Sequence, residues 1–231
     1  FSSQQHKHFL MDNKIFEDVD KYIENLLIPQ DEALLKAEES LVTENIPQIS
    51  VSPNQGKFLQ IMAFSCNAKR ILEVGTLAGY STIWMARALP ADGKLITIEF
   101  EPHHAEVAKK NINRAGLDSK VKIITGKALE ILEKMIAGNT EPFDMIFIDA
   151  DKPPYTEYFQ QALKLSHSGT VIIADNVIRN GDILHENSSD EKVLGVQRFN
   201  KFLSECKEVN ATIIQTVGVK EYDGMAIAVV K

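Results

Sequence analysis

Cysteine and long apolar runs are scarce in this sequence. Its 231 residues include only two cysteines, Cys66 and Cys206, whose positions match no metal-binding spacing. Both lie in amphipathic patterns and are expected to be buried thiols, which favours a reducing compartment and a cytoplasmic location. No apolar run approaches the ~18 residues of a membrane-spanning helix, and we expect no signal peptide. The sequence therefore predicts neither a disulfide framework nor a membrane partner.

Basic residues are outnumbered by acidic ones. Lys and Arg total 25 against 32 Asp and Glu, which gives a net charge of −7 at pH 7. A nucleic-acid-binding surface needs clustered positive charge, whereas the basic residues here are scattered among the acids. We therefore expect no nucleic-acid partner. The composition, 44% hydrophobic and 25% charged, is typical of a globular protein, and the length suits one sizeable α/β domain.

Two kinds of apolar periodicity alternate along the chain. Residues 12–28 and 31–44 predict two amphipathic helices, and the capping box Ser52-Pro53-Asn54-Gln55 predicts the start of a third. From residue 71 onward, short apolar strands alternate with helices, and a long polar loop is expected at 179–191. The predicted strands are 71–74, 95–98, 121–124, 145–148, 170–174, 212–217 and 225–230, with Asp223-Gly224 expected in the connection between the last two.

This order of elements predicts the fold class. Strands that alternate with helices form a doubly wound, mostly parallel α/β sheet, here with seven strands. The last two strands, which no helix separates, are expected to form a C-terminal antiparallel hairpin. Residues 1–50 are interpreted as an N-terminal helical cap and residues 51–231 as the main domain.

The segment 70–81 predicts a strand, a tight turn and a helix. Corners of this type open the nucleotide-binding sheets of α/β proteins. Glu73 falls within the apolar strand, where a buried carboxylate needs a polar partner, and a ligand hydroxyl or amine is the expected one. Dinucleotide-binding corners have the pattern G-x-G-x-x-G, but Leu77 takes the place of the second glycine between Gly75 and Gly79. The corner therefore favours a ligand without a pyrophosphate, such as S-adenosylmethionine.

Acidic residues stand at the ends of four predicted strands: Glu73, Glu99, Asp149 and Asp175. A single acid at such a position often only caps the following helix. Because ligands bind at the carboxyl edge of these sheets, four acids there predict one binding crevice. Glu99 follows Gly75 by 24 residues, close to the ~20 expected for an acid that binds ribose hydroxyls. This spacing alone suits NAD, FAD or S-adenosylmethionine.

Four motifs narrow the choice of ligand. They are Leu72-Glu73-Val74-Gly75 with Gly79-Tyr80-Ser81, Gly126-Lys127-Ala128-Leu129, the segment 143–152 ending in Asp149-Ala150-Asp151-Lys152, and Asp175-Asn176-Val177 with Asn180-Gly181. Together they resemble the motifs of the cation-dependent caffeoyl-CoA and catechol O-methyltransferase family, within the class I S-adenosylmethionine-dependent methyltransferases. The resemblance runs from about residue 49 to the C-terminus.

The resemblance implies a role for each matching residue. The positions that match cofactor-binding residues are Val51, Glu73, Gly75, Ser81, Glu99, Ala128 and Asp149. Asp149, Asp175 and Asn176 match the ligands of a divalent cation, and their hard oxygen donors suit Mg²⁺ or Ca²⁺. Lys152 matches the lysine that accepts the proton of a phenolic hydroxyl. The implied reaction is methyl transfer from S-adenosylmethionine to an acceptor hydroxyl, with S-adenosylhomocysteine as the second product.

The resemblance also bears on the acceptor and on assembly. Plant members carry Trp-Asn-Gly after the metal pair, whereas this sequence has Arg179-Asn180-Gly181, which argues against a bulky phenylpropanoid thioester. We therefore expect a small catechol-like or polyphenolic acceptor. Tyr155, Tyr158 and His185 are candidate pocket residues, although packing or surface positions are the simpler expectation. Family members are commonly dimers, and a homodimer is expected here.

Three other interpretations are compatible with parts of the sequence. An NAD(P)-dependent oxidoreductase shares the fold, but Leu77 disfavours a pyrophosphate-binding corner, and Lys152 and Tyr155 stand in the reverse order of a Tyr-x-x-x-Lys pair. A methyltransferase that acts on nucleic acid or protein is disfavoured by the acidic composition and by the lack of an Asn-Pro-Pro-Tyr-like motif. A non-catalytic binding domain would need neither the metal-ligand set nor the lysine beside it.

Overall fold

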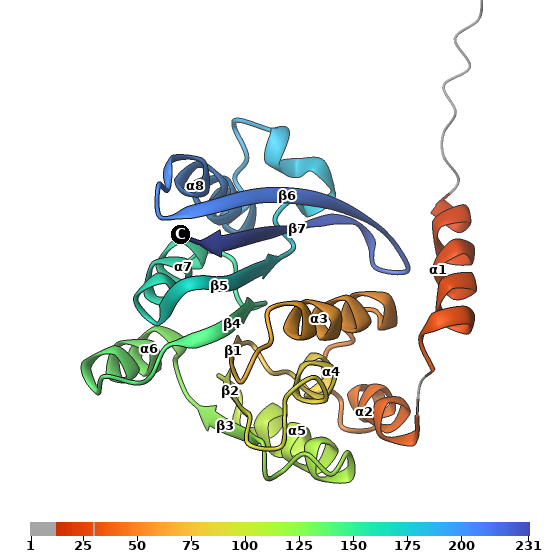
Figure 1. The fold of residues 1–231 in the computed structure, drawn as a ribbon. Helices are drawn as coiled ribbons and strands as arrows, with labels where there is room; N and C mark the ends of the chain where they lie inside the picture. Colours follow the sequence, from red (N-terminus) through yellow and green to blue (C-terminus); the bar gives the residue numbers. More distant parts are fainter. Residues whose placement is uncertain (1–12, 30) are drawn as a thin grey trace, which may run out of the picture.

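The structure, a computed structural model, describes residues 13–29 and 31–231 (Figure 1). In chain order these residues form α1 (Asn13–Leu27), α2 (Glu32–Thr43), α3 (Pro53–Ser65), β1 (Arg70–Val74), α4 (Tyr80–Ala86), β2 (Lys94–Glu99), α5 (Pro102–Arg114), β3 (Val121–Thr125), α6 (Ala128–Ala137), β4 (Phe143–Ile148), α7 (Tyr155–Lys164), β5 (Ser166–Asp175), the 3-10 helix η1 (Arg179–Leu184), α8 (Glu191–Glu205), β6 (Val209–Gly218) and β7 (Glu221–Val230). The predicted alternation of strands and helices is confirmed. None of the described helices is long and apolar enough to span a membrane.

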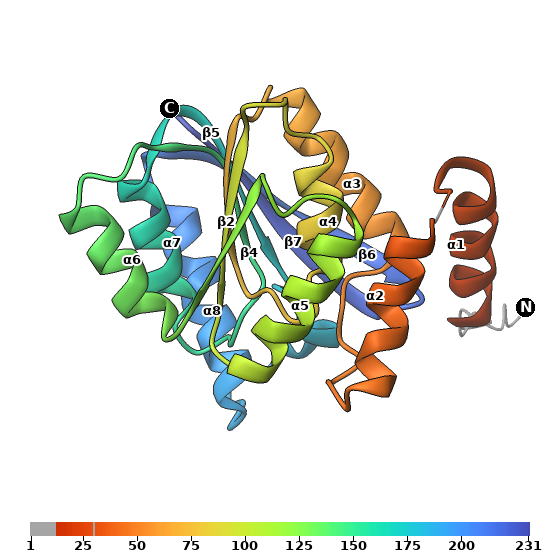
Figure 2. The ribbon, with the colours of Figure 1, turned by 90° about the horizontal axis from the view of Figure 1, so that it is seen from below.

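One seven-stranded sheet forms the centre of the molecule, in the order β3-β2-β1-β4-β5-β7-β6. The five strands from β3 to β5 are parallel, and β7 runs antiparallel to both β5 and β6. Helices α3, α4 and α5 cover one face of the sheet, and α6, α7 and α8 cover the other (Figure 2). The predicted doubly wound, mostly parallel sheet with a C-terminal antiparallel pair is therefore confirmed.

Local sequence explains where the first helices of the fold begin. In the predicted capping box of α3, Ser52 Oγ accepts the N–H of Gln55, and the Gln55 side chain accepts the N–H of Ser52. Asp31 caps α2 by accepting the N–H of Leu34. Gly79 precedes α4 with a φ of 84°, a left-handed conformation that glycine adopts without a steric penalty. This last turn sends the chain directly from β1 into α4.

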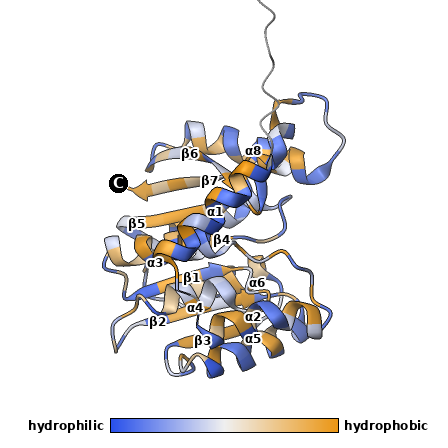
Figure 3. Cartoon of the chain, turned by 90° about the vertical axis from the view of Figure 1, so that its right-hand side faces the viewer, coloured by the Kyte–Doolittle hydropathy of each residue, from blue (hydrophilic) through white to orange (hydrophobic). Residues whose placement is uncertain are grey.

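Apolar side chains on the two faces of the sheet form two large clusters. One lies under α3 and α4 and includes the fully buried Leu59 and Ile83, and the other lies under α7 and α8 and includes Phe159 and Phe199. Figure 3 shows apolar colouring along β5 and β7 and polar colouring on the outer faces of the helices. Burial of each large side chain contributes roughly 1.5–3 kcal/mol. The two clusters therefore fix the positions of the strands, and with them the positions of the carboxyl ends of these strands.

The parallel register brings the ends of four strands to one level. Val74 in β1 pairs with Ile98 in β2 and with Ile148 in β4, and Ile148 pairs with Ala174 in β5. The residue that follows Ile98, Ile148 and Ala174 is in each case an acid, and the residue before Val74 is also an acid. The four strand-end acids therefore share one edge of the sheet, as predicted.

The predicted position of Asp223-Gly224 in a turn is wrong. Residues 219–220 join β6 to β7, and Asp223-Gly224 lies inside β7. The carboxylate of Asp223 accepts the backbone N–H groups of Ile178 and Arg179, each at 2.9 Å. A Cβ on the following glycine would lie 2.5 Å from Ile178 Cδ1. The Asp-Gly pair therefore serves the contact between β7 and the segment after β5 rather than a turn.

Two smaller expectations also change. The segment 179–191, expected to be a loop, begins with the 3-10 helix η1, in which Asn180 and Gly181 have left-handed φ values of 56° and 89°. Cys66 and Cys206 are only partly buried, because each stands at the C-terminal cap of a helix rather than within its apolar face.

The two N-terminal helices reach the rest of the molecule by separate contacts. α2 packs against α4 and α5, whereas α1 stands at one side and contacts α3 and β6 (Figures 1 and 2). Asp20 anchors α1, because its carboxylate accepts Asn54 Nδ2 at 2.6 Å and the N–H of Val219 at 2.9 Å. Residues 1–12 and 30 of the predicted cap lie outside the described residues, and its boundary at residue 50 stays a prediction.

Candidate active site

The candidate site lies at the carboxyl edge of the sheet, where the segments after β1, β2, β4 and β5 meet. Two groups of residues occupy this edge. The first group, called the β1 corner, consists of Glu73, Gly75, Thr76, Leu77, Ser81, Thr82 and Glu99. The second group, called the β4–β5 cluster, consists of Asp149, Lys152, Tyr155, Asp175 and Asn176. Because β1 and β4 are neighbouring strands, the two groups adjoin.

Glu73 is fully buried in β1, and its carboxylate is paired within the chain. Its Oε1 accepts a hydrogen bond from Ser81 Oγ at 2.6 Å, and its Oε2 accepts one from Thr82 Oγ1. Burial raises the pKa of Glu73 to about 7, and the hydroxyl donors partly offset that rise. The expectation that a ligand must supply its polar partner is wrong, because the first turn of α4 supplies it. Cofactor contacts by Glu73 and Ser81 stay predictions.

The side chain of Glu99 binds the backbone of the loop that follows β1. Its Oε2 accepts the backbone N–H of Thr76 at 3.1 Å and that of Leu77 at 2.8 Å, and its Oε1 accepts that of Glu101 at 3.0 Å. His104 Nδ1 lies 3.6 Å from the same Oε1 atom. A carboxylate offers about four acceptor positions, so Glu99 keeps capacity for a ligand hydroxyl. Its predicted contact with ribose stays a prediction.

Gly75 joins the two groups. It has a φ of 101°, and a Cβ at this position would lie 1.9 Å from the backbone carbonyl oxygen of Asp149. A side chain here would clash with the backbone at the end of β4, so glycine allows the two strand ends to lie in direct contact. The need for glycine in this corner is therefore explained by the fold itself, before any ligand is considered.

The remaining predicted cofactor residues are Val51 and Ala128. Val51 is 5% exposed and belongs to the apolar cluster under α3 and α4. Ala128 is half-buried at the first position of α6, just after the carboxyl end of β3. Neither side chain has a polar atom, so each offers apolar contact alone. Their contact with the cofactor stays a prediction.

Lys152 is 6% exposed, and its ammonium group is held by three acceptors. Nζ donates to Asp149 Oδ1 at 3.2 Å, to the backbone carbonyl of Asp175 at 3.3 Å and to the hydroxyl of Tyr155. Nζ also lies 4.5 Å from the centre of the Tyr155 ring. Lysine is seldom buried to this degree unless it is paired. These contacts direct the ammonium group inward, to the ends of both β4 and β5.

Asp175 ends β5 with 2% of its surface exposed. Its Oδ1 accepts the backbone N–H of Asn176 at 2.8 Å, and Asn176 itself has a left-handed φ of 58°. Burial and the charge of Asp149 raise the pKa of Asp175 to about 7, and Lys152 opposes that rise. The structure therefore brings the three predicted metal ligands and the predicted proton acceptor to one place.

Sequence reasoning underrated Tyr155, which it treated as a packing or surface residue. The side chain is fully buried at the start of α7, and its hydroxyl accepts from Lys152 Nζ and donates to the carbonyl oxygen of Asp175 at 2.9 Å. The available signal was its spacing of three residues from Lys152, which a single turn can bridge, and the N–H of Tyr155 does bond to the carbonyl oxygen of Lys152 at 3.2 Å. Of the other two candidates, Tyr158 is buried beside it and His185 is exposed.

The donor set of the β4–β5 cluster fits a divalent cation. Two carboxylates and one amide oxygen are hard donors, and Mg²⁺ or Ca²⁺ completes its shell with water or ligand oxygens. Among the described residues, no group of three or more His, Cys, Asp and Glu side chains is arranged to hold a metal. A site here would therefore depend on the amide of Asn176 and on outside oxygens, and the metal ligands stay a prediction.

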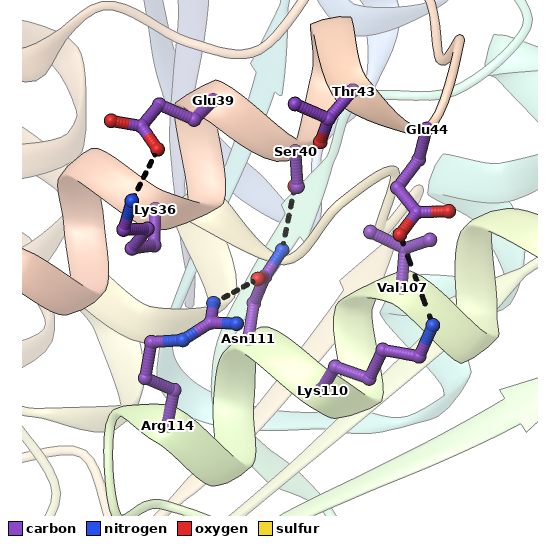
Figure 4. Close-up of a pocket in the computed structure, with 9 residues that line it drawn as sticks. All are labelled: Lys36, Glu39, Ser40, Thr43, Glu44, Val107, Lys110, Asn111 and Arg114. Atoms are coloured by element: carbon purple, nitrogen blue, oxygen red, sulfur yellow. Dashed lines mark hydrogen bonds and ion pairs between the residues drawn. The ribbon is translucent and has the colours of Figure 1, made fainter.

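A cavity of about 240 Å³ lies away from this edge, between α2 and α5 (Figure 4). Its polar side chains pair with one another: Lys36 with Glu39, Lys110 with Glu44, and Asn111 with Ser40 and Arg114. None of the predicted site residues lines this cavity. Because these contacts are made within the chain and no predicted site residue takes part, the carboxyl edge of the sheet remains the candidate site.

Known proteins resemble the chain along almost its whole length. The family model described as O-methyltransferase matches residues 24–229. A catechol O-methyltransferase from Niastella koreensis is 64% identical over 221 residues, which cover 96% of this chain and 100% of that protein. An O-methyltransferase from Bacillus cereus, solved with SAH, has a TM-score of 0.93 and 46% identity, with 95% of this chain and 100% of that chain covered. The O-methyltransferase TomG from Streptomyces achromogenes, which is involved in tomaymycin synthesis and was solved with SAM, has a TM-score of 0.93 and 45% identity, with 96% and 100% covered.

These similarities agree with the geometry of the carboxyl edge. They exclude the oxidoreductase and the non-catalytic interpretations. They also agree with a corner in which Leu77 replaces the glycine that a pyrophosphate would require. The chain belongs to the O-methyltransferase family, and it is an S-adenosylmethionine-dependent O-methyltransferase.

Proposed function

We propose that this enzyme methylates one hydroxyl of a catechol-like or polyphenolic small molecule, with a divalent cation bound by the β4–β5 cluster. The observation that carries the proposal is the buried position of Lys152 beside the carboxylate of Asp149 and the end of β5. The relative from Niastella koreensis, which the chain matches along that protein's whole length, is named a catechol O-methyltransferase, and this name supports the acceptor class.

Asp149, Asp175 and Asn176 are the proposed ligands of Mg²⁺ or Ca²⁺. These residues would hold a divalent cation, which when bound would supply Lewis-acid chemistry that orients the hydroxyls of the acceptor and lowers their pKa. The protein holds the donors in place, since Asp175 is bonded to the N–H of Asn176 and the backbone of Asp149 lies against Gly75. The burial of Asp175 limits competition from water and strengthens its electrostatic interactions.

Lys152 is the proposed acceptor of the proton that the reacting hydroxyl releases. A general base must lie within hydrogen-bond reach of that proton. The hydroxyl of Tyr155 and the carbonyl of Asp175 hold Nζ beside Asp149, so it faces the same place as the proposed metal ligands. The residue therefore needs no large movement to meet an acceptor oxygen at the end of β4 or β5.

The β1 corner is the proposed site of S-adenosylmethionine, which supplies the methyl group. Glu99 retains acceptor capacity for a ribose hydroxyl. Glu73 and Ser81, which are hydrogen-bonded to each other, would contact the methionine portion of the cofactor. The other proposed contacts are the backbone at Gly75, the apolar side chains of Val51 and Ala128, and the end of β4 at Asp149. The relatives solved with SAH and with SAM support this assignment.

A small acceptor panel tests the proposal. The enzyme is assayed with S-adenosylmethionine and either catechol or phenol, in the presence of Mg²⁺ or of EDTA. We expect methylation of catechol that EDTA abolishes, and little methylation of phenol. Asp175→Asn should reduce the turnover of catechol, whereas the matched control Asp92→Asn, an exposed acid in the turn before β2, should not. Equal turnover of catechol and phenol in EDTA would overturn the metal-assisted mechanism.

A homodimer is part of the same proposal. α1 leaves an apolar stripe uncovered, with exposed fractions of 46–65% at Ile15, Val19, Tyr22 and Leu26. The spacing of four, three and four residues places them on one helix face, which suits the same helix of a second copy. Light scattering should give a dimer mass for the wild type and a monomer mass for Val19→Glu, and a monomeric wild type would reject the proposal. A cytoplasmic location and the lack of a nucleic-acid partner stay predictions.

A further inference from the structure

Four residues of α8 contact three separate segments of the proposed acceptor side: Gly195, Gln197, Arg198 and Asn200. The three segments are the turn at Lys152-Pro153, the end of β5 at 175–177, and η1 with the residues just after it. α8 packs against α7 and η1 and is anchored in the core by the fully buried Phe199. One helix therefore touches the turn that carries Lys152, the end of β5 and η1.

The first contact is with the turn that carries Lys152. A Cβ on Gly195 would lie 2.5 Å from the carbonyl oxygen of Lys152 and 2.7 Å from Cα of Pro153, so the helix backbone presses directly on this turn. Arg198 donates to the carbonyl of Pro153 at 2.6 Å and forms a two-pronged ion pair with Glu157 on α7. The backbone of the turn is therefore fixed to α8.

The second contact is with the end of β5. Asn200 Nδ2 donates to the carbonyl oxygen of Val177 at 2.9 Å. Val177 directly follows Asn176, and its own N–H bonds to the carbonyl of Gly224 on β7 at 3.0 Å. A left-handed residue such as Asn176 persists when its surroundings determine its conformation. The bonds from Asn200 and Gly224 supply this constraint from both sides of the chain.

The third contact is with η1. Gln197 Nε2 donates to the carbonyl oxygens of Ile183 at 2.9 Å and His185 at 3.0 Å. No residue of η1 is buried, and Leu184 is 80% exposed, so apolar packing stabilises this segment little. Segments with few buried contacts open at a low cost in free energy. The two hydrogen bonds from Gln197 are therefore a main part of the contact between η1 and α8.

We propose that α8 sets the geometry of the acceptor side, with Gly195, Gln197, Arg198 and Asn200 as positioning residues. They fix the Lys152 turn, the end of β5 and η1 relative to one another. This inference rests on the proposed function, because it takes these segments as the acceptor site. Within the described chain, no hydrogen bond from an α8 side chain reaches the β1 corner, so cofactor affinity should be independent of these residues. A misplacement of about 1 Å can cost on the order of 10²-fold in rate.

Two variants and two matched controls test this proposal. Gln197→Glu keeps the size of the side chain but turns a carboxylate toward two carbonyl oxygens, and Gly195→Ala places a Cβ against the turn. The controls are Lys201→Ala, exposed on the same helix, and Gly138→Ala, whose Cβ would meet nothing closer than 3.2 Å. Each protein is assayed for turnover of catechol with Mg²⁺, for the Kd of SAH by Trp84 fluorescence, and for backbone hydrogen exchange by segment.

We expect kcat to fall at least tenfold in both α8 variants, while the Kd for SAH stays within twofold of the wild-type value. Hydrogen exchange should become faster at residues 178–186 in Gln197→Glu and stay unchanged at residues 70–86. Unchanged kcat and exchange in Gln197→Glu would overturn the inference, as would a parallel loss of turnover and SAH affinity. Gln197 is only half-buried, so its variant is informative even if Gly195→Ala fails to fold.

The same experiment separates this inference from the proposed function. A wild-type enzyme that does not methylate catechol, together with the expected exchange pattern, would refute the acceptor class and support α8 as the element that holds these segments. A wild-type enzyme that methylates catechol, with α8 variants that behave like it, would refute the role of α8 alone.

Discussion

Replacement of Glu73 by Gln should remove a pH-dependent loss of stability. The carboxylate is fully buried in β1, and its pKa is raised in the folded protein from 4.5 to about 7. In the unfolded chain the group ionises at its ordinary value. Between these two pH values the folded protein therefore keeps a proton that the unfolded chain has released. Under that condition the free energy of unfolding decreases as the pH rises.

The magnitude follows from the difference between the two pKa values. That difference, 7 − 4.5, is about 2.5 units, which corresponds to roughly 3 kcal/mol. The stabilisation by neutral Glu73 is fully present below pH 4.5 and is lost as the pH rises through about 7. Gln does not ionise, and its amide N–H group adds a cost of about 1–3 kcal/mol that is the same at every pH. The free energy of unfolding of the wild type, minus that of Glu73→Gln, should therefore decrease by about 3 kcal/mol between pH 4.5 and 8.

Urea unfolding at pH 4.5, 6, 7 and 8, followed by the fluorescence of Trp84, measures this decline. Glu133→Gln is the matched control, because Glu133 is exposed on α6 and its replacement should leave the pH profile unchanged. Parallel profiles for the wild type and Glu73→Gln, separated by a constant offset, would refute the reasoning. Such a result would mean that Glu73 is ionised in the folded protein throughout this range.

Three further changes have specific expected outcomes. Gly75→Ala should abolish SAH binding measured by calorimetry, because its Cβ would meet a backbone oxygen at 1.9 Å, and retained affinity would contradict the close contact of the two strand ends. Tyr155→Phe should lower kcat about tenfold and leave the Kd of SAH unchanged, since it removes the hydroxyl that holds the lysine, and an unchanged kcat would mean that the other acceptors suffice. Asp144→Ala should lower the free energy of unfolding in urea by about 1–2 kcal/mol, because one carboxylate oxygen accepts two backbone N–H groups at the start of β1. A change below about 0.5 kcal/mol would show that water replaces that acceptor.

The placement of the strand-end acids could be predicted from the sequence because it depends on short-range order. Glu99, Asp149 and Asp175 each follow a short apolar segment directly, and the carboxyl ends of parallel strands share one edge. The prediction that the β1 corner does not suit a pyrophosphate also depended on local sequence, because it rests on one residue, Leu77, in the place of the second glycine. The structure confirmed the fold and the convergence of these residues.

Other features could not be predicted because they depend on contacts between distant segments. Asp223-Gly224 is locally a turn signal, yet the carboxylate of Asp223 accepts N–H groups 44 and 45 residues earlier in the chain. The polar partner of Glu73 was assigned to a ligand, because the sequence does not show that the first turn of α4 folds back over β1. The contacts of α8 are of the same kind, since a helix pattern identifies its buried face but not the backbone that it touches.

The position of β7 means that the acceptor side is completed only after β7 has been translated. β7 follows β6 in the sequence but lies between β5 and β6 in the sheet. Its residues supply the acceptors for the N–H groups of Val177, Ile178 and Arg179, just after the proposed metal ligands. Ribosomes add about 5–20 residues per second, so the 221 − 175 = 46 residues from the end of β5 to the start of β7 take about 2–9 s. A nascent chain can therefore assemble the methyl-donor corner while its acceptor side still lacks the strand that completes it.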